Sequence, residues 1–277
     1  MINTSLLIFK KNVFSQNGED GIIKYLFELI NPQGKICCEF GAWDGIHLSN
    51  CRQLILEGWR GLLIESDKER FSDLIKTYKD NLKVKCVNEL VDLETNKLES
   101  ICNKNGIQEI DFLSIDIDGF DFEVFESLLI FPLVICVEVN AGHSPDKLTI
   151  YESNISKNNV GQSLAHFTKV ATNKGYSLVC YTGNAFYVRN DILGKHKEIS
   201  TISNEEAYLD FLHFLSKEEK EWLYLVNKGL VEPHFHFQNK HLSRKNLKIN
   251  FSTSIALIIK SVKENLLNNL SSPKIIQ

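Results

Sequence analysis

Residues 36–45, with the sequence ICCEFGAWDG, decide how the rest of the chain is organised. The first five positions are mostly apolar and β-compatible and predict a short buried strand, and Gly41 and Gly45 bracket a turn before a helix expected near Leu48. A glycine at the end of a strand lets a ligand approach the backbone, and the amide groups that open the following helix favour an electron-rich group. The stretch therefore predicts a strand, turn and helix that cradle a nucleotide-like ligand.

Two carboxylates beside this turn narrow the ligand class. Glu39 precedes the first glycine and Asp44 follows it, and the spacing differs from the GxGxxG pattern of dinucleotide-binding proteins. Negative charges at this point would repel a pyrophosphate. They suit a ligand that carries a cationic amino-acid end.

A second strand brings another acid to the same edge of the predicted sheet. Residues 62–64 are apolar and follow a helix that ends at Gly58, and Glu65 comes directly after them. In a doubly wound sheet an acid at this place accepts hydrogen bonds from two ribose hydroxyls. The same geometry serves S-adenosylmethionine and NAD, so Glu65 indicates an adenosine ligand without choosing between them.

Five sequence motifs occur in an order that resembles one enzyme family. They are SQNGEDG at 15–21, EFGAWDG at 39–45, LLIESD at 62–67, IDFLSIDIDGFDFEV at 110–124 and ICVEVN at 135–140. Together they resemble the FkbM-like O-methyltransferases, which belong to the class I S-adenosylmethionine-dependent methyltransferases. The resemblance covers roughly residues 14–191.

This resemblance implies a fold, a cofactor and a set of binding residues. The fold is an α/β, Rossmann-like sheet that is mostly parallel and ends in an antiparallel hairpin, and the cofactor is S-adenosyl-L-methionine. The cofactor-binding residues that we expect are Gln16, Glu19, Glu39, Gly41, Ala42, Asp44, Gly45, Glu65, Ser66, Asn88 and Asp116. For Gln16 and Glu19, helix capping is an equally good interpretation, with Ser15 as the N-cap. The acceptor implied by the resemblance is a hydroxyl on a sugar or glycan precursor.

Acidic side chains also follow two later strands. The strand expected after residue 110 delivers Asp116 and Asp118 to the carboxyl edge of the sheet, and the next strand ends in Glu138 and Asn140. Adjacent carboxylates repel each other unless a cation or a shared proton relieves them, which makes a divalent ion a reasonable inference. By position these residues resemble the magnesium site of catechol-type O-methyltransferases. We therefore expect Mg²⁺ or Mn²⁺ on Asp116, Glu138 and Asn140, with Asp118 as a further candidate.

Two groups are candidates for the catalytic base. His143 lies in a Gly-His-Ser-Pro loop, and the unperturbed pKa of histidine lies near neutral pH. Asp116 is the competing base. The Asp116-Ile-Asp118-Gly sequence also permits two other enzyme classes: a haloacid dehalogenase-type phosphatase with an aspartate nucleophile, and a metal-dependent nucleotide-sugar glycosyltransferase.

Composition excludes some partners and indicates a compartment. The net charge is −4, from 31 basic and 35 acidic side chains, without a clustered basic stripe, so we expect no nucleic-acid partner. No apolar run approaches the ~20 residues of a membrane span. Seven cysteines without a CxxC pair indicate reduced core residues and a cytoplasmic protein.

The family motifs end well before the end of the chain. We therefore predict a methyltransferase domain over residues 1–191 and a mainly helical extension over residues 192–277. The amphipathic pattern of residues 255–270 is typical of a helix that packs on a domain, forms a contact between copies in a homo-oligomer or touches a membrane surface, with packing on the domain as the default. The histidines at 234 and 236 have no third ligand nearby in sequence, which argues against a metal site there.

Overall fold

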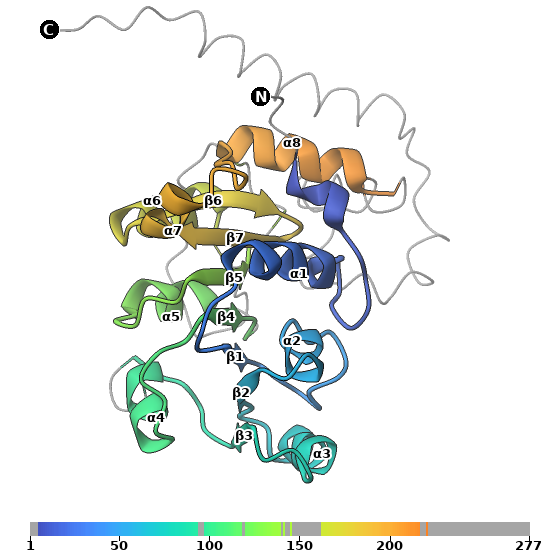
Figure 1. The fold of residues 1–277 in the computed structure, drawn as a ribbon, viewed down its shortest axis with the longest axis vertical. Helices are drawn as coiled ribbons and strands as arrows, with labels where there is room; N and C mark the ends of the chain where they lie inside the picture. Colours follow the sequence, from blue (N-terminus) through green and yellow to red (C-terminus); the bar gives the residue numbers. More distant parts are fainter. Residues whose placement is uncertain are drawn as a thin grey trace, which may run out of the picture.

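The protein is built around one mixed, twisted sheet. The computed structural model describes residues 5–93, 97–117, 120–139, 141, 145, 162–216 and 220. Within them, seven strands lie in the order β3-β2-β1-β4-β5-β7-β6 (Figure 1). The neighbours from β3 to β5 are parallel, whereas β7 is antiparallel to both β5 and β6. The predicted fold class, a mostly parallel Rossmann-like sheet that ends in a hairpin, is confirmed.

The central strands are short and buried along their whole length. The strands are β1 (Ile36–Phe40), β2 (Arg60–Ile64), β3 (Val84–Val87), β4 (Phe112–Ile115), β5 (Val134–Glu138), β6 (Tyr176–Tyr181) and β7 (Asn184–Arg189). All residues of β1 and β4 are buried, as expected for parallel strands that are covered on both faces. Because β1 to β5 run parallel to one another, their carboxyl ends lie at one common edge of the sheet.

Helices cover both faces of the sheet. They are the 3₁₀ turn η1 (Leu6–Phe9), α1 (Glu19–Ile30), α2 (Arg52–Leu56), α3 (Lys68–Tyr78), α4 (Leu98–Lys104), α5 (Asp121–Ser127), α6 (Leu164–Asn173), α7 (Asn190–Lys195) and α8 (Asn204–Phe214). The first three α-helices lie on one side of the sheet, and α4 and α5 lie on the other (Figure 1). Each side has its own apolar cluster. The two clusters bury both faces of the parallel strands.

Two helices begin later than the sequence pattern predicts. Helix α1 begins at Glu19 after Gly18, which has φ +89°, so Ser15 is not its N-cap. The Ser15 hydroxyl instead donates to Asp20 Oδ2 at 2.6 Å. Helix α2 begins at Arg52, because Leu48 has φ +58°, which a right-handed helix cannot accommodate. Both segments before these helices are loops that bend around the edge of the sheet.

The apolar core continues beyond residue 191. Ile192 and Ile199 belong to the cluster that contains α1, and Tyr208 and Phe211 of α8 belong to the opposite cluster. The rings of Tyr181 and Phe211 lie 4.9 Å apart between centroids. The segment that follows residue 191 thus packs on the body of the domain as far as α8. The histidines at 234 and 236 and residues 255–270 lie outside the described residues.

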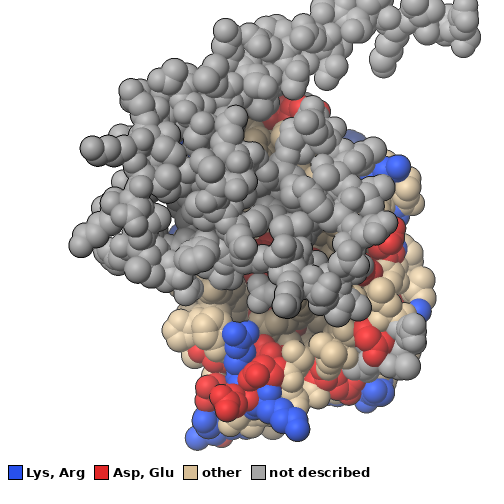
Figure 2. Space-filling view, turned by 180° about the vertical axis from the view of Figure 1, so that it is seen from behind, with Lys and Arg blue, Asp and Glu red and all other residues tan. Residues whose placement is uncertain are grey.

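The surface carries charges of both signs, and most of the cysteines lie in the core. On the face shown in Figure 2, basic and acidic side chains are interspersed at the end where α3, β3 and α4 lie. All seven cysteines are free, and six of them are buried. None of the helices in the described ranges is long and apolar enough to cross a membrane.

Candidate active site

A cavity of about 600 Å³ lies at the carboxyl edge of the sheet. Its wall is formed by the segments at the ends of β1, β2, β3 and β4, together with Gln16 ahead of α1 and Arg70 of α3. The predicted site residues on this wall are Gln16, Glu39, Gly41, Ala42, Glu65, Ser66 and Asp116. The fold thus brings together residues that are up to a hundred positions apart in sequence.

Gly41 makes the floor of the cavity possible. It has φ +68°, and a Cβ atom at this position would lie 1.9 Å from the backbone oxygen of Asp116. A side chain there is excluded both by the backbone conformation and by the contact with the end of β4. The turn after β1 therefore lies directly against the end of β4, and the backbone stays open to a ligand.

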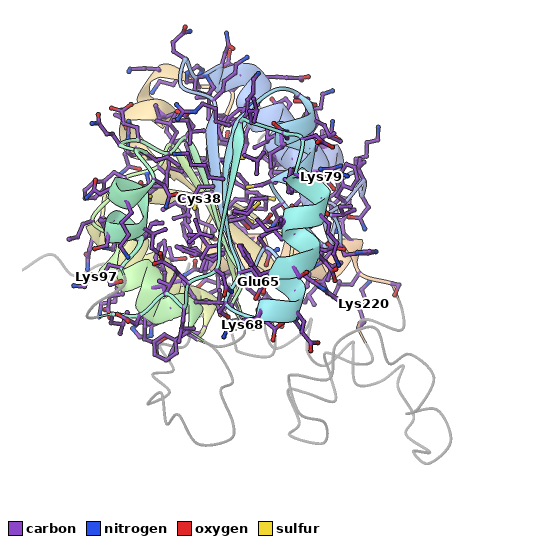
Figure 3. The ribbon with its side chains drawn as sticks, turned by 90° about the horizontal axis from the view of Figure 1, so that it is seen from below. Cys38, Glu65, Lys68, Lys79, Lys97 and Lys220 are labelled. Carbon is purple, nitrogen blue, oxygen red and sulfur yellow. The ribbon has the colours of Figure 1, made fainter. Side chains whose placement is uncertain are left out.

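Glu65 stands at the end of β2, as predicted, and its carboxylate is held by the backbone. Its Oε2 accepts a hydrogen bond from the Trp43 amide at 2.9 Å, and its Oε1 accepts one from the Asp67 amide at 2.8 Å. Figure 3 shows Glu65 near the Lys68 end of α3, with Cys38 further back in the sheet. Each carboxylate oxygen has a second lone pair for a ligand hydroxyl.

Glu39 is almost completely buried behind the turn. Its Oε2 accepts a hydrogen bond from the Ser49 hydroxyl, and its Oε1 accepts one from the Asn50 amide, both at 2.6 Å. Burial disfavours the charged carboxylate and raises the pKa of Glu39 to about 7, although these hydrogen bonds oppose the shift. Glu39 therefore changes its charge within the physiological pH range.

Three predicted cofactor residues contact other parts of the protein instead of the cavity. Asp44 accepts hydrogen bonds from the amides of Ile46 and His47, both at 2.9 Å. Gly45 packs against α3, and its carbonyl oxygen accepts a hydrogen bond from Tyr78. Asn88 donates to the backbone oxygens of Glu65 and Ser66, at 2.8 and 3.1 Å. In this structure Asp44 and Asn88 order the loops around the cavity.

Glu19 likewise binds within the fold. It is fully buried, and its Oε1 accepts hydrogen bonds from Thr182 Oγ1 at 2.6 Å and from Asn184 Nδ2 at 3.2 Å. Its Oε2 accepts a hydrogen bond from the Asn17 amide. The carboxylate joins the start of α1 to the turn between β6 and β7. This placement does not support the expected role of Glu19 as a cofactor ligand.

An acidic cluster adjoins the cavity. Asp116, Asp121 and Glu138 each offer one carboxylate oxygen, and these atoms lie within 4.8 Å of one another. Asp116 belongs both to this cluster and to the cavity wall. Three other predicted residues, namely Asp118, Asn140 and His143, lie outside the described residues.

Sequence reasoning missed several residues of the site. Asp121 is the first residue of α5, and its carboxylate lies beside those of Asp116 and Glu138. The sequence pattern placed it on a helix and gave no sign of this contact. Trp43 lines the cavity with φ +46°, and its ring lies 4.9 Å from the Arg70 guanidinium carbon. Asn50 also lines the cavity. A bulky residue between two turn glycines was the available signal for Trp43.

The sheet order, the glycine turn and the acid after β2 together form a site that suits an adenosine-containing cofactor. Residues 87–178 match the family model of the methyltransferase FkbM domain. This match covers less than half of the chain, and it agrees with the resemblance to S-adenosylmethionine-dependent methyltransferases seen in the motifs. The phosphatase and glycosyltransferase alternatives have no support in this match.

Several solved structures resemble the chain at low sequence identity. The CMeT domain of the citrinin polyketide synthase is 11% identical with a TM-score of 0.44, and the match covers 62% of this chain and 51% of that domain. The SAH-bound methyltransferase PaMTH1 of Podospora anserina is 14% identical with a TM-score of 0.43, covering 64% and 79%. The SAH complex of an O-methyltransferase from Bacillus cereus is 16% identical with a TM-score of 0.43, covering 66% and 85%. No curated protein sequence matches the chain.

Proposed function

We propose that the protein transfers a methyl group from S-adenosylmethionine to a hydroxyl of a sugar or glycan precursor. The observation that carries this proposal is the position of Asp116, which lies on the cavity wall and within the acidic cluster. An acceptor hydroxyl beside that cluster meets groups that accept its hydrogen bond and its proton. The resemblance of the five motifs to FkbM-like enzymes supports the choice of a sugar acceptor.

The cavity fits the cofactor in size and in chemistry. Its volume of about 600 Å³ lies in the usual range for small-molecule sites. Gly41 leaves the backbone accessible, and Glu65 offers acceptors for ribose hydroxyls. The cofactor, when bound, supplies a methyl group on a sulfonium leaving group. The residues of the chain then have to align the acceptor and exclude water.

We propose two groups that could remove the proton of the acceptor hydroxyl. Asp116 is the proposed base on the cavity wall, and His143 is proposed as the second candidate. Asp116→Asn keeps the side-chain shape and removes the basic oxygen. We expect a loss of methyl transfer of about 10²-fold or more, with S-adenosylhomocysteine affinity changed far less. Unchanged turnover would remove Asp116 from the mechanism, and His143→Gln measured in parallel tests the other base.

We also propose that a divalent ion assists the reaction. Asp116 and Glu138 were expected as ligands, and Asp121 completes a set of oxygen donors that suits Mg²⁺ or Mn²⁺. Asn140 and Asp118 remain proposed ligands. A bound ion would relieve the repulsion among the three carboxylates and lower the pKa of an acceptor hydroxyl.

Calorimetric titration of the protein with Mg²⁺ and Mn²⁺ tests the metal without relying on turnover. We expect saturable binding that Asp121→Asn weakens by at least about tenfold, whereas Asp73→Asn on the exposed surface of α3 leaves it unchanged. Absence of saturable binding, together with full activity in the presence of a chelator, would exclude metal assistance.

The acceptor class is tested by methyl-transfer assays with a panel of sugars, glycan precursors and small phenols. Transfer to sugar hydroxyls that depends on S-adenosylmethionine is the expected result. Transfer only to phenols or to amines would contradict the proposed acceptor while keeping the enzyme class.

We propose the cytoplasm as the location of the protein, because all seven cysteines are free. Oligomerisation through residues 192–277 stays a prediction.

A further inference from the structure

The backbone on either side of β5 accepts a hydrogen bond from a buried tyrosine. Ahead of the strand, the Tyr176 hydroxyl donates to the Pro132 carbonyl oxygen at 2.7 Å. Beyond its end, the Tyr208 hydroxyl donates to the Ala141 carbonyl oxygen at 3.0 Å. The two tyrosines are 1% and 3% exposed. The bonds are chemically alike, but only the second one lies at the carboxyl edge of the sheet, where the acidic cluster is found.

The bond to Ala141 comes from a helix outside the family match. Tyr208 lies on α8, whereas the matched region ends at residue 178. Its ring lies 6.3 Å from the ring of Tyr181 on β6 and 6.2 Å from the ring of Phe211 on its own helix, measured between centroids. Figure 1 shows α8 at the β6 end of the sheet. The packing of these rings fixes the place of the hydroxyl, so Tyr208 joins α8 to the end of β5.

The end of β5 carries one acid of the cluster. Glu138 is the last residue of the strand, and its carboxylate lies within 4.8 Å of the two other carboxylates of the cluster. The next amide, that of Val139, donates to the Gly183 carbonyl oxygen at 3.2 Å, which fixes the strand end from the side of β7. Three residues after Glu138, Tyr208 fixes the same backbone from α8. The direction of the Glu138 side chain depends on this backbone.

We propose that Tyr208 is a positioning residue of the active site, which holds the end of β5 so that Glu138 meets Asp116 and Asp121. The inference rests on the proposed function, in which the acidic cluster assists methyl transfer, and it gives α8 a part in that reaction. Ala141 is only half-buried, so water can replace the tyrosine as a donor to its carbonyl oxygen. Loss of the hydroxyl should therefore affect the placement of Glu138, on which the rate depends, more than the stability of the fold.

The test is Tyr208→Phe, which removes the hydroxyl and keeps the ring. We expect kcat for methyl transfer to fall about 3- to 10-fold, the change that corresponds to one neutral hydrogen bond. The dissociation constant of S-adenosylhomocysteine should stay within about twofold of the wild type, because Gly41 and Glu65 lie on other strands. The matched control is Tyr176→Phe, the same change at the other end of β5, which should leave kcat within about twofold.

A second readout does not depend on turnover. Hydrogen exchange of the Val139 amide, measured by NMR relative to the Ile135 amide in the middle of β5, should be about 3- to 10-fold faster in Tyr208→Phe than in the wild type. Tyr176→Phe should leave this ratio unchanged. Wild-type kcat in Tyr208→Phe, or an equal fall of kcat in both variants, would overturn the inference. A wild type that transfers no methyl group, with faster Val139 exchange still seen in Tyr208→Phe, would instead contradict the proposed function and support the hold on β5.

Discussion

At the scale of single residues, Gly41 has the most restrictive environment in the site. Its φ is +68°, and a Cβ atom would lie 1.9 Å from the Asp116 backbone oxygen. We expect Gly41→Ala to lower the free energy of unfolding by about 2–4 kcal/mol, from the left-handed backbone and the enforced displacement of β4. Denaturant titration measures this change, and calorimetry with S-adenosylhomocysteine should show weakened binding.

Gly106 provides a matched control for this substitution. It has a similar φ of +64°, and an added Cβ would meet nothing within 4 Å. Gly106→Ala should therefore lower the free energy of unfolding by only about 1–2 kcal/mol, the cost of a left-handed backbone for a residue with a side chain. It should leave ligand affinity unchanged. Equal effects of the two substitutions would show that the contact between Gly41 and Asp116 has no energetic importance.

Glu39 should make stability depend on pH. Burial raises its pKa to about 7 from a usual value of 4.5, so the folded protein binds a proton that the unfolded chain releases. The stabilisation from this proton is complete below about pH 4.5 and is lost as the pH rises through about 7. The loss is on the order of 3 kcal/mol.

Unfolding titrations between pH 4.5 and 8 should therefore show that Glu39→Gln reduces the decrease in stability seen in the wild type. The exposed Glu28→Gln on α1 serves as the control and should leave the pH dependence unchanged. Parallel curves for the wild type and Glu39→Gln would contradict the raised pKa. The affinity for S-adenosylhomocysteine should also fall as the pH drops below 7, because the protonated carboxyl attracts an ammonium group less strongly.

At the scale of elements, Glu19 joins α1 to the turn between β6 and β7. Its carboxylate accepts hydrogen bonds from Thr182 and Asn184, and all three side chains are buried. We expect Glu19→Ala to lower the free energy of unfolding by about 2–4 kcal/mol, because two buried donors lose their acceptor. Thermal unfolding measures the loss.

This substitution also separates the two roles considered for Glu19. A residue that only holds the fold should leave the S-adenosylhomocysteine affinity of the folded protein within about threefold of the wild type. Unchanged stability together with a loss of affinity of tenfold or more would instead restore the cofactor role that the sequence predicted. Exposed Glu28 on α1 is a suitable control position for the same substitution.

At the scale of the whole molecule, the cofactor cavity joins segments from inside and outside the family match. Residues 87–178 contribute Asp116, whereas Glu39, Gly41 and Glu65 precede that region. Binding of S-adenosylhomocysteine at about 100 times its dissociation constant should add about 2.7 kcal/mol to the stability of the folded state. For a chain of this size the melting temperature should rise by roughly 5–10 °C. NAD at the same concentration should give no shift, and a shift with NAD alone would contradict the cofactor assignment.

The sequence was most informative where short-range patterns determine the outcome. Residues 36–40 form the predicted strand, because a run of apolar, β-compatible residues is a local signal. Gly41 and Glu65 were predicted to lie at the site because each directly follows a buried strand. The carboxyl ends of neighbouring parallel strands necessarily meet at one edge of the sheet.

The sequence by itself thus determined the order of strands and helices, the enzyme class and the acids at the strand ends. Only the tertiary structure decided which polar residues face the cavity. Glu19 accepts a hydrogen bond from Thr182, 163 positions away, and Asn50 reaches Ser114, 64 positions away. Such partners are chosen by the packing of distant segments and by left-handed residues such as Leu48 that redirect a loop. Local periodicity carries no information about either effect, which is why Asn50 and Asp121 emerged only from the folded chain.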